Sequence, residues 1–164
     1  MDILILVLLG TQDKQFNRLL EEIDKQIIKG NIKEEVIVQA GHTKYISDKM
    51  TIFDLISGNE FNKYIEEADL IITHGGVGSI ITAIKLGKKV IACPRLKQYK
   101  EHTNDHQIQI IDTFTKANYI IGMNDVSELE EKLKQIKQFE PKKVEFDNSK
   151  MINIIENFIS ESNQ

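Results

Sequence analysis

The sequence predicts an α/β fold in which helices cover both faces of a parallel sheet. Short apolar runs alternate along the chain with longer segments whose apolar residues recur with a helical period. This alternation is expected when buried parallel strands are connected by helices. The chain has 164 residues, of which 41% are hydrophobic and 28% charged, so it is long enough for one domain with a substantial core.

The expected strands are short apolar runs bounded by polar or turn residues. They comprise residues 3–9, 35–38, 70–73, 90–92 and 119–121, with a further strand expected near residues 51–55. Helical periodicity marks the segments between them. The expected helices comprise residues 14–29, 60–67, 79–86, 104–117 and 127–137. Ser127, with Glu130 three residues later, has the pattern of a capping box and supports a helix that begins there.

The C-terminal part of the chain is expected to stand apart from the main domain. Residues 138–148 contain Pro141, several charges and no clear period, so we expect a connector. Residues 151–159 carry a broad apolar stripe and predict a last amphipathic helix, which packs on its own domain or grips a partner. We therefore expect the main domain over residues 1–140 and the connector with its helix over residues 141–164.

Composition and charge exclude several classes of protein. The formal charge is -4 and the 21 Lys and Arg residues are scattered, so a nucleic-acid partner has no electrostatic support. A single cysteine, Cys93, ends an apolar run and predicts a buried core residue in a reducing compartment. The longest apolar run, residues 3–9, is far shorter than the roughly 20 residues that cross a bilayer. Asp2 stands where a secretory signal is basic, so we expect a cytoplasmic protein.

A glycine-rich turn follows the strand expected at residues 70–73. The stretch reads HGGVGS over residues 74–79 and leads into a helix. Glycines allow tight turns and close backbone approach, while the free N–H groups and the positive end of the helix dipole attract a phosphate. Glycines at such a turn can also serve only to pack a helix against a strand.

A polar loop follows the next expected strand at the same edge of the sheet, where open α/β sheets bind their ligands. It reads RLKQYKEHTNDHQ over residues 95–107. Carboxylates accept hydroxyl hydrogen bonds of sugars, and Gln and His donate or accept them. Arg95, Lys97 and Lys100 are positioned to offset diphosphate charge. The alternative is a solvated loop whose helix is capped by Asn104.

The run from Ala68 to Gln107 resembles the C-terminal domain of glycosyltransferase family 28. The resemblance is greatest to stand-alone members of the family, which include subunits of the dolichol-pathway UDP-GlcNAc transferase and of bacterial capsule or exopolysaccharide transferases. It implies a Rossmann-like parallel sheet that forms the donor-binding half of a GT-B fold. Residues 9–12 and 38–41 resemble the first and second loops of this family.

The resemblance and the polar loop together give a set of expected donor-binding residues. These are Gly10, Thr11, Gln12, Gly41, His74, Gly75, Gly76, Gly78, Ser79, Arg95, Glu101, His102, Asp105, His106 and Gln107. The substitution Gly76→Asp is expected to abolish donor binding. Many GT-B enzymes carry a ribose-binding acid where this chain has Thr82, so the ribose contact is left open.

The family further implies an inverting transfer in which an acceptor hydroxyl displaces UDP from the sugar. A general base must deprotonate that hydroxyl, and His42 and Asp13 are the candidates within this chain. The sequence has no Asp-x-Asp motif, and its four His residues lack the spacing of a zinc site. No metal or other cofactor is expected.

The resemblance also implies a partner. We expect a membrane-anchored subunit that presents a lipid-linked sugar acceptor and holds this chain at the inner face of the membrane. UDP-galactose or UDP-GlcNAc is the favoured donor, in a surface-polysaccharide pathway. One alternative is a non-catalytic, nucleotide-sugar-binding regulatory subunit, for which Thr82 is the sequence support. A self-contained epimerase or hydrolase is a second alternative, against which the chain length argues.

Overall fold

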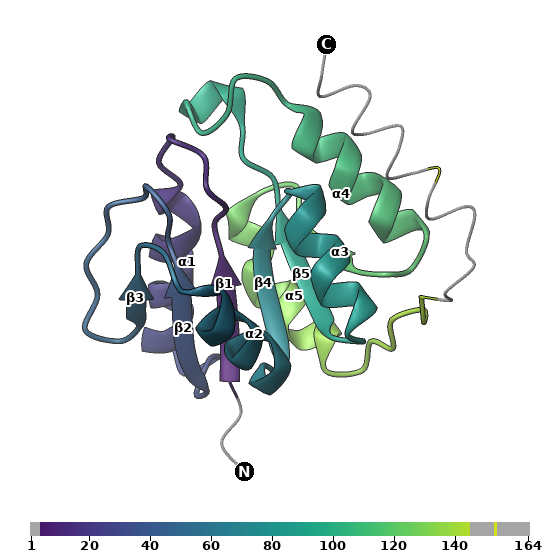
Figure 1. The fold of residues 1–164 in the computed structure, drawn as a ribbon, viewed down its shortest axis with the longest axis horizontal. Helices are drawn as coiled ribbons and strands as arrows, with labels where there is room; N and C mark the ends of the chain where they lie inside the picture. Colours follow the sequence, from purple (N-terminus) through teal and green to yellow (C-terminus); the bar gives the residue numbers. More distant parts are fainter. Residues whose placement is uncertain (1–3, 145–152, 154–164) are drawn as a thin grey trace.

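The computed structural model describes residues 4–144 and residue 153. The described residues form a six-stranded sheet with the strand order β3-β2-β1-β4-β5-β6 (Figure 1). Each neighbouring pair of strands is parallel. This order is that of doubly wound, Rossmann-like sheets, so the predicted fold class is confirmed.

The strands begin and end close to the predicted positions. Their bounds are β1 (Leu4–Leu8), β2 (Glu35–Gln39), β3 (Thr51–Phe53), β4 (Leu70–His74), β5 (Lys89–Cys93) and β6 (Ile121–Gly122). All five residues of β1 and of β4 are buried. Strands covered on both faces have this continuous apolar character, which is why the sequence shows runs and not an apolar-polar alternation.

Helices cover both faces of the sheet. Their bounds are α1 (Asn17–Ile28), α2 (Gly58–Glu67), α3 (Val77–Lys85), α4 (His106–Lys116) and α5 (Leu129–Ile136), with short 3-10 turns η1 (Lys97–Tyr99) and η2 (Val126–Glu128). The apolar stripes of α1 and α5 pack in one core layer with Ile5 and Val7 of β1. Those of α2, α3 and α4 pack in the other layer with Leu4 and Leu6.

Side-chain hydrogen bonds account for two of the differences between the predicted and the observed helix starts. α1 begins at Asn17 and not at Lys14, since the N–H of Phe16 donates to the hydroxyl of Thr43 at 3.1 Å. The segment at residues 126–136 is capped by Asp125, whose carboxylate accepts from the N–H of Ser127. The capping box therefore pairs Asp125 with Glu128, and the predicted pair Ser127 and Glu130 is wrong.

The expected C-terminal connector and helix lie only partly within the described residues. Residues 139–144, the described end of the expected connector, form no helix or strand. The helix expected at residues 151–159 lies, apart from Asn153, outside the described residues. No helix in the part of the chain that the structure describes is both long and apolar enough to cross a bilayer.

Candidate functional site

The loops that follow β1 and β2 are tied together at the carboxyl edge of the sheet. The side chain of Gln15 spans them: its Nε2 donates to the carbonyl of His42 at 2.6 Å, and its Oε1 accepts from the N–H of Lys44 at 2.6 Å. Asn17 adds a bond from its Nδ2 to the carbonyl of Lys44 at 2.8 Å. The first and second loops therefore form one connected unit, as a shared ligand site requires.

Glycines allow these loops to approach the turn after β4. Gly41 has φ +60°, and a Cβ there would lie 2.3 Å from the carbonyl oxygen of Gly10. Gly10 has φ +80°, and its Cβ would lie 2.6 Å from the imidazole of His74. A Cβ on Gly76 would lie 2.4 Å from the same ring. The absence of a side chain at Gly10 and Gly76 is therefore explained by the space that His74 needs, without any ligand.

His74 is buried and held by Gln107. The Nε2 of Gln107 lies 3.1 Å from Nδ1 of His74, while its Oε1 accepts from the N–H groups of Gly75 and Arg95, each at 2.9 Å. Because the amide oxygen of Gln107 accepts twice, its nitrogen is the donor to His74. Burial, followed by the nearby charge of Arg95, lowers the pKa of His74 to about 3, so the imidazole is neutral at physiological pH.

This arrangement corrects two expectations. Gln107 is buried and its polar atoms are used inside the protein, so it braces the glycine turn and does not face a donor. The N–H of Gly75 is committed to Gln107, so it is not available to a phosphate. Both residues shape the site from beneath.

The beginning of α3 remains open. Gly78 lies in the first helical turn, is exposed, and a Cβ there would meet nothing within 4 Å. Ser79 follows it and is half-buried. No side chain caps α3, and the first N–H groups of a helix have no acceptor within the helix. With the positive end of the helix dipole, this is a suitable place for a phosphate.

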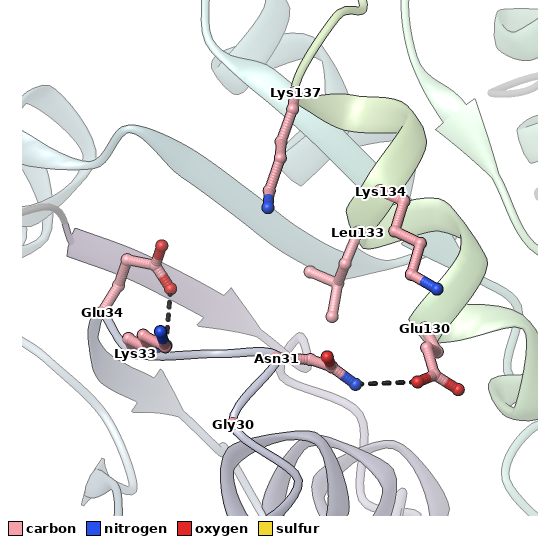
Figure 2. A pocket seen from close by; sticks show the side chains of 8 residues that line it. All are labelled: Gly30, Asn31, Lys33, Glu34, Glu130, Leu133, Lys134 and Lys137. Atoms are coloured by element: carbon pink, nitrogen blue, oxygen red, sulfur yellow. Dashed lines mark hydrogen bonds between the residues drawn. The ribbon is translucent and has the colours of Figure 1, made fainter.

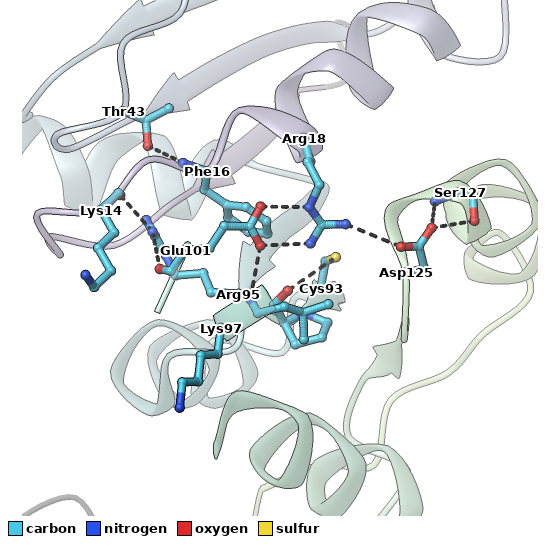
Figure 3. A network of polar contacts seen from close by, with 12 residues as sticks. Lys14, Phe16, Arg18, Thr43, Cys93, Arg95, Lys97, Glu101, Asp125 and Ser127 are labelled. Carbon is cyan, nitrogen blue, oxygen red and sulfur yellow. Dashed lines mark hydrogen bonds and ion pairs between the residues drawn. The ribbon is translucent and has the colours of Figure 1, made fainter. Parts of the chain in front are cut away.

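Arg95 lies in the interior, contrary to the expectation that it offsets diphosphate charge. Its side chain is fully buried, and its Nη1 donates to the carbonyls of Lys14 at 2.9 Å and Glu101 at 3.1 Å. Its Nη2 donates to the carbonyl of Leu9. Burial lowers the pKa of Arg95 to about 10, which still leaves it charged. Arg95 therefore ties the polar loop to the first loop (Figure 3).

Glu101 is likewise turned inward. It is buried, and its carboxylate receives two bonds from Arg18, at 2.7 Å from Nε and 2.8 Å from Nη2 (Figure 3). It also accepts from the N–H of Leu96 at 3.0 Å. The expectation that Glu101 faces the donor is thus not met, because Arg18 occupies its carboxylate. Sequence reasoning missed Arg18, which is a lone arginine in the first turn of α1 next to the first loop.

The remaining residues of the polar loop are accessible. Asp105 and His106 are exposed and His102 is half-buried. The Nδ1 of His102 accepts from the N–H of Asn104 at 3.2 Å, and burial, then the charge of Arg95, lowers the pKa of His102. The contact of these three residues with a donor stays a prediction.

Four candidate residues of the first two loops are also at the surface. Thr11 and Asp13 are exposed, Gln12 is half-buried and His42 is exposed. His42 and Asp13 lie on the two loops that Gln15 joins. The role of either residue as a general base stays a prediction.

Two other kinds of chemistry find no support near this edge. Cys93 is buried, and burial raises the pKa of its thiol to about 12, so it is a core residue, as predicted, and not a nucleophile. Within residues 4–144 and at residue 153, no group of three or more His, Cys, Asp or Glu side chains is arranged to hold a metal ion.

A hollow at the opposite edge of the sheet is the competing candidate. It has a volume of about 210 Å³ and is lined by Gly30, Asn31, Lys33, Glu34, Glu130, Leu133, Lys134 and Lys137 (Figure 2). Asn31 donates to Glu130 at 2.9 Å, and the lysines stand among carboxylates. Gly30 follows the C-terminal end of α1 and Lys137 that of α5; since the C-terminal end of a helix dipole is negative, the hollow is a poorer phosphate site than the start of α3.

Comparisons with known proteins bear on the family and the fold of this chain. The family model described as glycosyltransferase family 28 C-terminal domain matches residues 4–161. The UDP-N-acetylglucosamine transferase subunit ALG13 of Candida albicans is 42% identical over 73 residues, which are 44% of this chain and 23% of that protein. The chain spans 23%, 45% and 57% of the lengths of three curated relatives with this name.

Solved structures share the fold. An NMR structure of ALG13 has a TM-score of 0.65 and 19% identity, covering 96% of this chain and 98% of that one. The glycosyltransferase of kitacinnamycin has a TM-score of 0.62 and 14% identity, covering 98% of this chain and 38% of that one. At these identities the likeness concerns the fold alone.

Proposed function

Because the chain belongs to the glycosyltransferase family 28 C-terminal domain family, we propose that it is the donor-binding subunit of an inverting UDP-sugar glycosyltransferase. The observation that carries this proposal is the open start of α3. Uncapped N–H groups, the exposed Gly78 and the half-buried Ser79 lie there, beside the loops after β1 and β5. A nucleoside diphosphate is an anion of the kind that such a helix start binds.

The diphosphate would lie against the first turn of α3, over Gly76, Gly78 and Ser79. The sugar would then lie near Asp105 and His106, whose exposed side chains supply an acceptor and a donor of hydrogen bonds. Backbone N–H groups and the helix dipole would stabilise the charge that develops on the leaving UDP. The names of the relatives favour UDP-N-acetylglucosamine as the donor sugar.

The acceptor side of the reaction is proposed to come from a partner. The relatives are named as subunits, which supports a partner. We infer a membrane-anchored subunit that presents a lipid-linked sugar and brings this chain to the inner face of the membrane. The names of the relatives give no support to a capsule or exopolysaccharide pathway.

The donor proposal is tested by calorimetric titration with UDP and with UDP-GlcNAc, UDP-galactose, UDP-glucose and UDP-glucuronate. Gly76→Asp is not a clean test of donor binding, because a side chain at residue 76 collides with His74 and would disturb the loops as well as the ligand. Gly78→Asp is the better choice, since its side chain enters open space. Gly78→Asn is its neutral control of the same shape.

We expect Gly78→Asp to weaken UDP binding at least about tenfold relative to Gly78→Asn, by about 1.4 kcal/mol or more, because only the aspartate repels the diphosphate. Both variants should unfold at nearly the parent temperature, as an acidic residue is favourable in a first helical turn. If the parent and both variants had the same UDP affinity, the diphosphate would not bind at α3.

A second candidate is a regulatory subunit that binds a nucleotide sugar without transferring it. Thr82 favours it: the hydroxyl donates to the carbonyl of Gly78 at 2.8 Å inside α3, so no acid stands at this position to hold a ribose. Donor binding without transfer, measured with the acceptor subunit and a lipid-linked acceptor present, would identify this alternative. Transfer under those conditions excludes it.

A further inference from the structure

Arg18 joins three elements that are distant in the sequence. From the first turn of α1 its guanidinium makes two hydrogen bonds to Glu101 and lies 3.3 Å from the carboxylate of Asp125 (Figure 3). The guanidinium carbon also lies 3.9 Å from the centroid of the Tyr99 ring. A planar guanidinium suits this combination of a bidentate ion pair and a stacking contact, which a lysine cannot reproduce.

The loop that Arg18 contacts adopts a conformation that needs support. Lys100 has φ +59°, a left-handed backbone that costs free energy in a residue other than glycine. Glu101 closes this turn twice: its N–H donates to the carbonyl of Leu96 at 3.1 Å, and its carboxylate accepts from the N–H of Leu96 at 3.0 Å. The conformation of residues 96–101 therefore depends on the placement of one carboxylate.

That carboxylate depends in turn on Arg18. The side chain of Glu101 is only 3% exposed, and a buried carboxylate without a cation is strongly unfavourable. Arg95 bonds the carbonyl of Glu101 and not its carboxylate. Among the described residues, Arg18 is the cation that pairs with the carboxylate of Glu101.

The same loop leads to the exposed groups of the donor site. His102 follows Glu101 directly, and Asp105 is tied back to the loop, where its Oδ1 accepts from the N–H of Lys97 at 2.9 Å. A shift of residues 96–101 would displace both side chains.

We propose that Arg18 is a positioning residue of the donor site, which acts through Glu101 to hold the loop that presents His102 and Asp105 to the donor. This inference rests on the proposed donor-binding function. Arg18 does not itself touch the donor in this account.

The test uses variants of the whole chain and three measurements, of which thermal unfolding gives the stability of each variant. The variants are Arg18→Met, Arg18→Lys, the double variant Arg18→Met with Glu101→Gln, and Lys25→Met as a control on an exposed part of the same helix. The affinity for UDP-GlcNAc is measured by calorimetry, with UDP alone as the comparison. Hydrogen exchange is measured for the backbone amides of residues 96–105, with β4 as the internal reference.

We expect Arg18→Met to bind UDP-GlcNAc roughly tenfold more weakly, because small displacements of binding groups are costly, and to exchange faster at residues 96–105 but not in β4. Arg18→Lys should keep the thermal stability better than it keeps the affinity. The double variant removes the unpaired buried charge, so it should regain stability while its affinity stays low. Lys25→Met should match the parent.

Two results would overturn the inference: parent-like UDP-GlcNAc affinity in Arg18→Met, or recovery of that affinity together with stability in the double variant. A parent chain that binds no UDP would instead contradict the proposed function. In that case faster exchange at residues 96–105 in Arg18→Met still supports the positioning role, and unchanged exchange overturns it.

Discussion

The two edges of the sheet are built in different ways. At the carboxyl edge, loops from β1, β2, β4 and β5 are locked by buried polar side chains, and glycines are placed where a Cβ would collide with a neighbour. At the amino edge, the hollow is lined by charged side chains on the surface (Figure 2). Close packing at the carboxyl edge leaves little free space but fixes the positions of the backbone groups there. Recognition of a phosphate by N–H groups requires such fixed positions. A measurable hollow is thus a weaker indication of function than an ordered set of donors.

The largest difference should appear between two glycines with positive φ, one at each edge. A Cβ on Gly41 at the carboxyl edge would meet the carbonyl oxygen of Gly10, whereas a Cβ on Gly30 at the amino edge, where φ is +82°, would meet nothing within 4 Å. We expect Gly41→Ala to lower the free energy of unfolding by about 2–4 kcal/mol, since backbone strain and overlap add. In Gly30→Ala only the backbone strain applies, so we expect the free energy of unfolding to fall by about 1 kcal/mol.

Urea unfolding of both variants measures this difference. Equal losses would mean that the loops at the carboxyl edge yield easily, and the contrast between the edges would fail.

The second difference concerns pH, because His74 at the carboxyl edge is buried and neutral. Its pKa is lowered to about 3 in the folded protein against about 6.5 in an unfolded chain. Between these values the unfolded state binds the extra proton, so stability is fully present above pH 6.5 and is lost as the pH falls towards 3. At pH 5 the loss from this group is about 2 kcal/mol.

The variant His74→Gln should be less stable than the parent at pH 7.5, and the gap should narrow by about that amount at pH 5. Urea unfolding of both proteins at the two pH values measures it. A constant gap would show that His74 gains a proton as readily in the folded protein as in the unfolded one.

Sequence patterns predicted the sheet and the edge at which the candidate loops gather, but not the contacts between those loops. Apolar runs predicted β1 and β4 because strands that are buried on both faces are apolar at consecutive residues. The burial of Arg95 and Glu101 is not predicted, since a charged side chain in a loop is usually exposed. Their burial depends on Lys14 and Arg18, which lie 81 and 83 residues away in the sequence. Local spacing carries no information about such pairs.

The smallest effect is expected at the amino edge. Lys134→Gln removes one exposed lysine from the hollow, and exposed substitutions of this kind change stability by less than about 0.5 kcal/mol. UDP affinity should equal that of the parent. A clear loss of affinity in the calorimetric titration would move the anion site to the amino edge.

Whether the diphosphate lies at the carboxyl edge against α3 can be measured by titrating the isotope-labelled chain with UDP and following its backbone amide resonances. Saturable shifts are expected at residues 76–79 and in the loops at residues 10–13 and 102–106, while residues 30–34 and 134–137 should not shift. Shifts confined to residues 30–34 and 134–137 would contradict this placement.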